Sequence, residues 1–144
     1  MNNTDVKVFF YGLFMDKGLL AEKGLHPSTP RHAFVDGYRL QIGRRATLVP
    51  DPIGRAFGVV MTIASEEAAA LYSDESVSDY IPETITAIFS DGDSEPAVSY
   101  NLPKDQLEGT NAAYANSLLR LATKLGFPNE YLEEIKGFSG ASDG

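Results

Sequence analysis

The feature that most constrains how this chain folds is a change of hydrophobic spacing along the sequence. Between residues 57 and 63, large apolar residues alternate with other residues, which is the period of a β-strand. In the last third, Tyr114, Leu118, Leu121 and Leu125 instead follow the period of a helix. Strand patterns dominate up to residue 100 and helical patterns dominate after it. The chain therefore reads as an α+β protein.

We predict five or six short strands, mostly antiparallel, in a closed or strongly curled sheet. The sequence SDGDS has the composition of a turn between the last two strands, and PDPIG at residues 50–54 is expected to end an earlier one. The predicted strands cover residues 6–12, 33–42, 46–49, 57–63, 83–89 and 97–100.

Helices are expected to pack on one side of this sheet. A short helix is predicted over about residues 16–23, and Ser65 can cap a second that runs to about Asp74. Gly126 and Pro128 should divide the C-terminal helical region in two. We predict one domain over residues 1–144, with an ordered core at about 6–138 and a frayed tail at 139–144.

Charge and composition narrow the classes of partner. Twelve Lys and Arg residues against twenty Asp and Glu give a net charge of −8, and only Arg44 and Arg45 form a basic pair. Such a chain repels phosphate backbones, so nucleic acid is not an expected partner. No apolar run approaches the roughly 20 residues that cross a bilayer, and the start MNNTDVKV does not resemble a signal peptide. We expect a cytoplasmic protein with no membrane partner, either a monomer or a weak homodimer.

Several common kinds of active site are missing from the sequence. The chain has no cysteine, which removes disulfides, thiolate metal sites and cysteine nucleophiles. His26 and His32 are expected in one loop, separated by two prolines, and they do not form a metal-binding motif. Nucleotide-binding glycine motifs and the GxSxG motif of serine hydrolases are absent as well. We therefore expect no metal and no cofactor.

The first candidate site is the junction Tyr11-Gly12-Leu13-Phe14, where a strand ends and a helix soon begins. A junction of this kind can direct several backbone N–H groups at one anion, and Gly12 would let a ligand approach closely. The alternative interpretation is an ordinary turn in which Leu13 and Phe14 belong to the core. Spacing alone does not separate these two interpretations.

The second candidate is Glu75. If the helix that starts at Ser65 continues far enough, Glu75 lies on the centre line of an apolar stripe that includes Leu71 and Tyr72. A carboxylate there would be partly desolvated, which raises its pKa and makes it a better base. The alternative is that the helix ends at Asp74 and that Glu75 turns toward solvent.

Taken in order, several motifs resemble those of the gamma-glutamylcyclotransferase-like (AIG2-like) superfamily. They begin with VFFYGLFM and continue through DGYRLQIG, ATLVPDPIGRAFGVVMTI, DESVSDY and NAAYANSLLRLATKLGFPNEYLEEIKGF, covering about residues 7–138. The resemblance implies a small barrel of five or six strands with flanking helices and a cavity at one end. It assigns the loop from Tyr11 to Phe14 to a glutamyl-type head group, Glu75 to the catalytic acid/base position and Tyr80 to the substrate site.

The resemblance also implies a reaction. The glutamate takes a proton from the substrate's α-amine, the amine attacks its own γ-carbonyl, and 5-oxoproline closes as an amine leaves. The nucleophile belongs to the substrate and the new ring has five members, so no metal or organic cofactor is required. The implied partner is a small molecule with a γ-glutamyl or similar carboxylate group.

Two departures from the family pattern leave the activity open. Leu13 stands where many members have Ser or Thr, and Ser76 follows the glutamate where members often have Gly. Three hypotheses follow: a cyclotransferase-like enzyme, a binding protein that has kept the cavity but lost turnover, and an interaction protein whose pocket is filled by its own side chains. Glu75 favours the enzyme, and the pair Leu13-Phe14 favours the binding protein.

Overall fold

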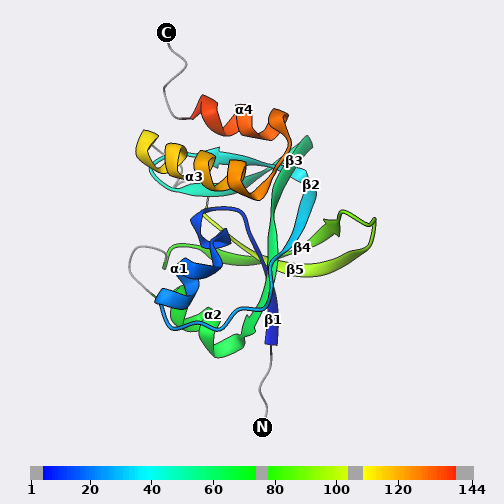
Figure 1. Ribbon diagram of the computed structural model, residues 1–144, viewed down its shortest axis with the longest axis vertical. Coiled ribbons are helices and arrows are strands. Elements are labelled where there is room, and N and C mark those ends of the chain that lie inside the picture. Colours follow the sequence, from blue (N-terminus) through cyan, green and yellow to red (C-terminus); the bar gives the residue numbers. More distant parts are fainter. Residues whose placement is uncertain (1–4, 74–77, 104–108, 139–144) are drawn as a thin grey trace.

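Five strands close into a barrel in the computed structural model, which describes residues 5–73, 78–103 and 109–138 (Figure 1). The spatial order around the barrel is β1-β3-β2-β4-β5. The predicted barrel is therefore confirmed, with five strands among the described residues. Their bounds are β1 (Asp5–Phe10), β2 (Arg31–Ile42), β3 (Ala46–Ala64), β4 (Ile81–Phe89) and β5 (Ser94–Asn101).

Antiparallel pairing runs through most of the barrel, as the sequence predicts. β3 pairs with β1 on one side and with β2 on the other, and β4 pairs with β2 and with β5. The barrel closes where β5 runs parallel to β1, with Val8 opposite Val98. This closure brings the end of β1 next to the end of β5, although their residues are about 90 positions apart in sequence.

The prediction that PDPIG ends a strand is wrong. β3 continues through these residues, because β2 and β3 change register there: Tyr38 pairs with Pro50, whereas Asp36 pairs with Arg55. Residues 51–54 of β3 thus lie opposite Gly37 alone. The turn-forming composition makes a bulge inside one long strand, and Ile53 at its tip is 93% exposed.

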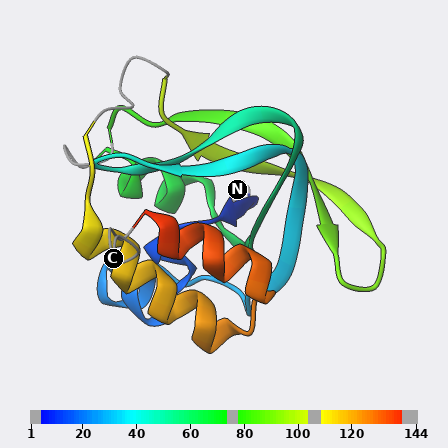
Figure 2. The ribbon, with the colours of Figure 1, turned by 90° about the horizontal axis from the view of Figure 1, so that it is seen from above.

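The helices gather around the barrel as two groups (Figures 1 and 2). α3 and α4 run side by side across one face, and Gly126, with a φ of 82°, ends α3 in the left-handed conformation that favours glycine. α1 follows a short 3-10 turn, η1, and the Asp16 side chain caps it by accepting a hydrogen bond from the Gly18 N–H at 2.9 Å. The bounds are η1 (Leu13–Met15), α1 (Lys17–Glu22), α2 (Ser65–Leu71), α3 (Ala112–Leu125) and α4 (Asn129–Gly137).

α2 is shorter than the sequence predicts. Ser65 is its first residue rather than its cap, and the helix ends at Leu71 instead of near Asp74. The next residue, Tyr72, is the C-cap of the helix, and its ring stacks on that of Tyr100 in β5. The apolar helical stripe on which the sequence argument for Glu75 was based therefore ends at Leu71. Glu75 itself lies outside the described residues, as does the tail at 139–144.

Burial shows which surfaces of the barrel are covered. Val8, Phe9 and Phe10 are consecutive in β1 and all are buried. Because consecutive strand side chains point to opposite faces, both faces of β1 are covered at this end. His32 lies in β2 rather than in a loop with His26, and its ring contacts Phe127 at 5.5 Å between centroids. Within the described ranges, no helix is long and apolar enough to span a bilayer.

Candidate functional site

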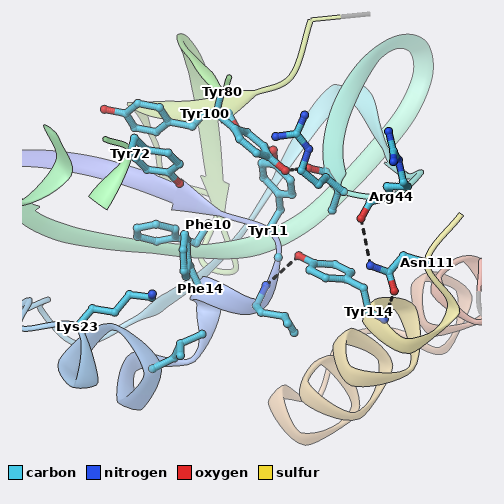
Figure 3. A pocket seen from close by; sticks show the side chains of 15 residues that line it. Phe10, Tyr11, Phe14, Lys23, Arg44, Tyr72, Tyr80, Tyr100, Asn111 and Tyr114 are labelled. Atoms are coloured by element: carbon cyan, nitrogen blue, oxygen red, sulfur yellow. Dashed lines mark hydrogen bonds between the residues drawn. The ribbon is translucent and has the colours of Figure 1, made fainter. Parts of the chain in front are cut away.

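A cavity of about 460 Å³ opens at the end of the barrel where β1 finishes (Figure 3). Its walls come from the loop after β1, from α1, from the turn between β2 and β3, from the chain just after α2 and just before β4, from β5 and from the first turn of α3. The termini of elements that are distant in sequence thus meet at one place. The cavity contradicts the hypothesis of a pocket filled by its own side chains.

Tyrosine is the dominant residue of this cavity. The chain has seven tyrosines, and five of them line it: Tyr11, Tyr72, Tyr80, Tyr100 and Tyr114. Each stands at or near the end of its element, where an aromatic ring can pack against the core while its hydroxyl points into a cavity. Phe10 and Phe14 complete an aromatic wall, with their rings edge to face at 6.2 Å.

Two of these tyrosines link neighbouring segments at the open end of the barrel through hydrogen bonds of their hydroxyls. The Tyr11 hydroxyl donates a hydrogen bond to the backbone carbonyl of Tyr100 at 2.6 Å, which ties the end of β1 to β5. The Tyr80 hydroxyl donates to the carbonyl of Ala46 at the start of β3. Burial raises the pKa of Tyr11 and Tyr80, so both hydroxyls stay protonated and act as donors.

Tyr72 is fixed by ring contacts. Its ring stacks on that of Tyr100 with centroids 3.8 Å apart and an interplanar angle of 10°, and it meets Phe14 edge to face at 6.2 Å. Burial raises the pKa of Tyr72 as well, and the neighbouring Tyr100 adds to the increase. Tyr72, just after α2, and Tyr80, just before β4, therefore both belong to the cavity wall.

The loop from Tyr11 to Phe14 lines the cavity, but one of its N–H groups already has a partner. The Leu13 N–H donates to the Tyr114 hydroxyl at 3.2 Å (Figure 3). A Cβ on Gly12 would lie 2.3 Å from the same hydroxyl oxygen. Gly12 therefore makes room for Tyr114, whereas the sequence suggested that it makes room for a ligand.

The N-terminus of α3 positions Tyr114. The Asn111 side chain accepts a hydrogen bond from the Tyr114 N–H at 2.9 Å, as an N-cap residue does. The same side chain donates to the carbonyl of Arg44 at 3.1 Å, in the turn between β2 and β3. This pair of bonds joins α3 to the barrel at the edge of the cavity.

Three positively charged side chains line the cavity together with the aromatic residues. Lys23, Arg44 and Arg45 line the cavity, and no carboxylate does so among the residues that the structure describes. Arg45 is paired with Asp79 at 3.1 Å, and the Lys23 ammonium lies 6.0 Å from the centre of the Phe14 ring. Figure 3 shows Lys23 and Arg44 on opposite sides of the cavity. Such a lining favours a ligand that carries a carboxylate.

The five described residues that the sequence analysis assigned to a site come together here. Tyr11, Gly12, Leu13, Phe14 and Tyr80 all line the cavity. Sequence reasoning missed Tyr72, Tyr100, Tyr114, Asn111 and the three cations. The available signal was the location of the tyrosines at element ends, together with the adjacent basic pair Arg44-Arg45 in a predicted turn region.

The described ranges contain no group of three or more His, Asp or Glu side chains that could hold a metal ion. The described cavity lining also has no Asp, Glu or His side chain that could accept a proton as a general base at neutral pH. Burial is the main cause that raises the pKa values of its tyrosines, so their hydroxyls stay protonated.

Neither known family models nor curated protein sequences give a match to this chain. Solved structures do match. A protein described as gamma-glutamyl cyclotransferase is 18% identical, with a TM-score of 0.79 over 94% of this chain and 88% of that one. A yeast gamma-glutamyl cyclotransferase specific to glutathione is 14% identical, with a TM-score of 0.68 over 96% of this chain and 97% of that one.

A third match is an AIG2-like protein from Mus musculus, 13% identical, with a TM-score of 0.60 over 79% of this chain and 93% of that one. Identities this low establish shared architecture and leave the activity open. The barrel and its order of elements nevertheless agree with the resemblance that the sequence motifs carry. The chain has the fold of the gamma-glutamylcyclotransferase-like and AIG2-like proteins.

Proposed function

We propose that this protein cyclises a small γ-glutamyl amide or amine conjugate to 5-oxoproline, with release of the amine and with Glu75 as general acid/base. One observation carries the proposal. The cavity is lined by the loop from Tyr11 to Phe14 and by both Tyr72 and Tyr80, the tyrosines between which Glu75 stands in sequence. In this proposal the loop and Tyr80 hold the γ-glutamyl head group.

The need for a base supports Glu75. The described lining offers hydroxyls that stay protonated, cations and an amide, and none of these accepts a proton at neutral pH. Glu75 is three residues from Tyr72, so even a fully extended chain keeps the two Cα atoms within about 11 Å. Two other carboxylates stand between Tyr72 and Tyr80: Asp79, which pairs with Arg45, and Asp74, which is next to Glu75 and serves as the matched control below.

The proposed reaction needs one proton carrier. The neutral α-amine of the glutamyl group attacks its own γ-carbonyl carbon, forming the new C–N bond of the ring, and Glu75 takes the proton that this nitrogen loses. The bond from the same carbon to the departing nitrogen then breaks, and Glu75 returns the proton to that nitrogen. The products are 5-oxoproline and a neutral amine. Because the nucleophile and the carbonyl belong to one molecule, the protein's main task is to hold them in the reactive conformation.

The cavity's charge and chemistry fit the rest of the ligand. Lys23 and Arg44 can attract its carboxylate, and tyrosine hydroxyls can donate hydrogen bonds to its oxygens. The aromatic wall would exclude water from the ring-closing carbonyl, which strengthens these polar contacts. A small molecule of this class, handled in the cytoplasm without a cofactor, is the proposed substrate.

A pair of variants tests the assignment of the base. Glu75→Gln should lower the turnover of a γ-glutamyl substrate by roughly 10²- to 10⁴-fold, because it keeps the size of the side chain and removes the base. Asp74→Asn should keep turnover near the wild-type level. If Asp74→Asn is the inactive variant, or if both are active, Glu75 is not the base.

The hydrogen bond between the Leu13 N–H and Tyr114 favours a second candidate function. An occupied loop N–H and a leucine in place of a hydroxyl residue suit a protein that binds small carboxylates without turning them over. Such a protein would bind glutamate or 5-oxoproline at the loop and would release no 5-oxoproline from any γ-glutamyl compound. Binding without product therefore distinguishes this candidate from the enzyme.

A further inference from the structure

The cavity has an apolar side and a polar side. Figure 3 shows Phe10, Phe14 and Tyr72 together on one side, while Tyr114 and Asn111 lie on the other. The residues of the polar side are held by the hydrogen bonds described above, whereas those of the apolar side are held by contacts between their rings. The two sides therefore offer a ligand different chemistry.

Ring contacts fix the shape of the apolar side. The Phe14 ring meets Phe10 and Tyr72 edge to face, each at 6.2 Å between centroids, and Tyr72 is in turn stacked on Tyr100. α1 follows η1, which carries Phe14, and its Leu19 also lines the cavity. We call Phe10, Phe14, Leu19 and Tyr72 the apolar subsite. Because its rings already hold one another, little conformational freedom is lost when a ligand covers them.

Part of the apolar subsite is open to a ligand. Phe10 is buried, but Phe14, Leu19 and Tyr72 are only half-buried. A ligand that removes such apolar surface from water gains affinity in proportion to the area covered. A flat aromatic group can in addition make edge or face contacts with the rings of Phe14 and Tyr72. The subsite therefore favours an apolar group, and an aromatic one most.

The apolar subsite adjoins both parts of the proposed reaction. Phe14 belongs to the loop that holds the head group in the proposed function, and Tyr72 precedes the proposed base Glu75 by three residues. A group attached to the departing nitrogen is therefore within reach of this surface. Lys23 stands beside it, with its ammonium 6.0 Å from the centre of the Phe14 ring. This charge would repel a second positive charge on the departing amine, so a cationic group is not the expected occupant.

We propose that the apolar subsite holds the side chain of the released amine, so that the protein prefers γ-glutamyl conjugates whose amine part carries an apolar and preferably aromatic group. This inference rests on the proposed function and narrows the class of compound on which the cavity acts. The apolar group makes no bond to the reacting atoms. Its burial raises kcat/KM because it stabilises the bound states relative to the free substrate.

The test measures kcat/KM for γ-glutamyl dipeptides that differ only in the released amino acid: glycine, alanine, leucine or phenylalanine. In the wild type kcat/KM should rise along this series. The phenylalanine conjugate should exceed the glycine conjugate by roughly 10- to 100-fold, the usual worth of burying a large apolar side chain. Phe14→Ala should remove most of this ratio. Phe34→Ala is the matched control: Phe34 lies in β2, contacts Phe57 and does not line the cavity, so the ratio should stay at its wild-type value.

The ratio between substrates separates a binding role from a structural one, because a loss of folded protein lowers kcat/KM for every compound alike. A wild-type ratio near one, or a preference for glycine, would overturn the inference and leave the proposed function standing. A ratio that Phe14→Ala leaves unchanged would also overturn it. If the wild type yields no 5-oxoproline from any of the dipeptides, the proposed function fails for this class of compound and the inference fails with it.

A second variant carries the test should Phe14→Ala not fold. Leu19 is half-buried in the short helix α1, so Leu19→Asn places an amide in the apolar subsite and leaves the aromatic contacts intact. The ratio of the phenylalanine conjugate to the glycine conjugate should fall in this variant too. An unchanged ratio would overturn the inference.

Discussion

The Tyr114 hydroxyl fills the space beside Gly12 that a larger side chain would need: its oxygen lies 2.3 Å from the position that a Cβ on residue 12 would take. After that oxygen, the nearest atom to such a Cβ is the Tyr114 ring carbon Cζ, at 3.7 Å, which is an ordinary contact. A Cβ on residue 12 would therefore clash with the Tyr114 hydroxyl oxygen alone. This relationship leads directly to a prediction about stability.

Gly12→Ala should destabilise the wild-type protein by about 1–2 kcal/mol, as overpacking of a filled site does. In the Tyr114→Phe background the same change should cost almost nothing, since the conflicting oxygen is gone. Urea unfolding of the four proteins in this double-mutant cycle measures the coupling between the two residues. Equal costs in both backgrounds would mean that the hydroxyl does not lie against Gly12 in solution.

Gly126 and Gly137 form a second informative pair. Gly126 has a φ of 82°, so Gly126→Ala should destabilise the protein by about 1 kcal/mol. Gly137 is the last residue of α4, and a Cβ there would meet nothing within 4 Å. Gly137→Ala should therefore leave stability unchanged or raise it by up to about 1 kcal/mol. Thermal unfolding of both variants measures whether Gly126→Ala lowers the stability while Gly137→Ala leaves it unchanged or raises it.

Glu67 should make the stability of the protein depend on pH. Its carboxylate accepts hydrogen bonds from the Ala64 N–H at 3.0 Å and from the His26 N–H at 3.0 Å, and it also contacts His26 Nδ1. These bonds lower the pKa of Glu67 below its ordinary value of 4.5, and the bond from the Ala64 N–H has the largest effect. The unfolded state thus binds this proton more readily, so the stabilisation is present above about pH 4.5 and is lost as the pH falls through the folded-state pKa.

The measurement compares the unfolding free energies of the wild type and Glu67→Gln at pH 7 and at pH 3. The wild type should be the more stable at pH 7, and the difference should shrink at pH 3. Glu66→Gln is the control, because it removes a charge from the same helical turn and leaves the three bonds in place. A difference that stays constant with pH would show that the charge of Glu67 contributes nothing.

Much of the fold could be predicted because its signals are local. The left-handed glycine after α3 and the turn sequence SDGDS each act within a few residues, so the sequence alone locates them. The bulge at residues 51–54 is different. PDPIG has turn composition whether it ends a strand or bulges from one, and only its pairing with β2 decides between the two.

The site was less predictable for a similar reason. Tyr72, Tyr100 and Tyr114 each look like a half-buried aromatic of its own segment, and only barrel closure brings the three together. Tyr72, the residue at which α2 ends, stacks on Tyr100, and this contact between distant segments cannot be anticipated from helical periodicity. In contrast, the motif from Tyr11 to Phe14 is continuous in sequence, so the sequence alone identifies it as a candidate site.

The central claim is that the cavity supports cyclisation of a γ-glutamyl compound. The most direct measurement incubates the purified protein with a panel of γ-glutamyl amino acids, amines and peptides and quantifies 5-oxoproline by mass spectrometry. We predict that at least one compound yields 5-oxoproline and its free amine in equal amounts, and that Glu75→Gln, shown to be folded, abolishes this yield. Absence of 5-oxoproline from every compound, with a folded wild-type protein, would contradict the claim.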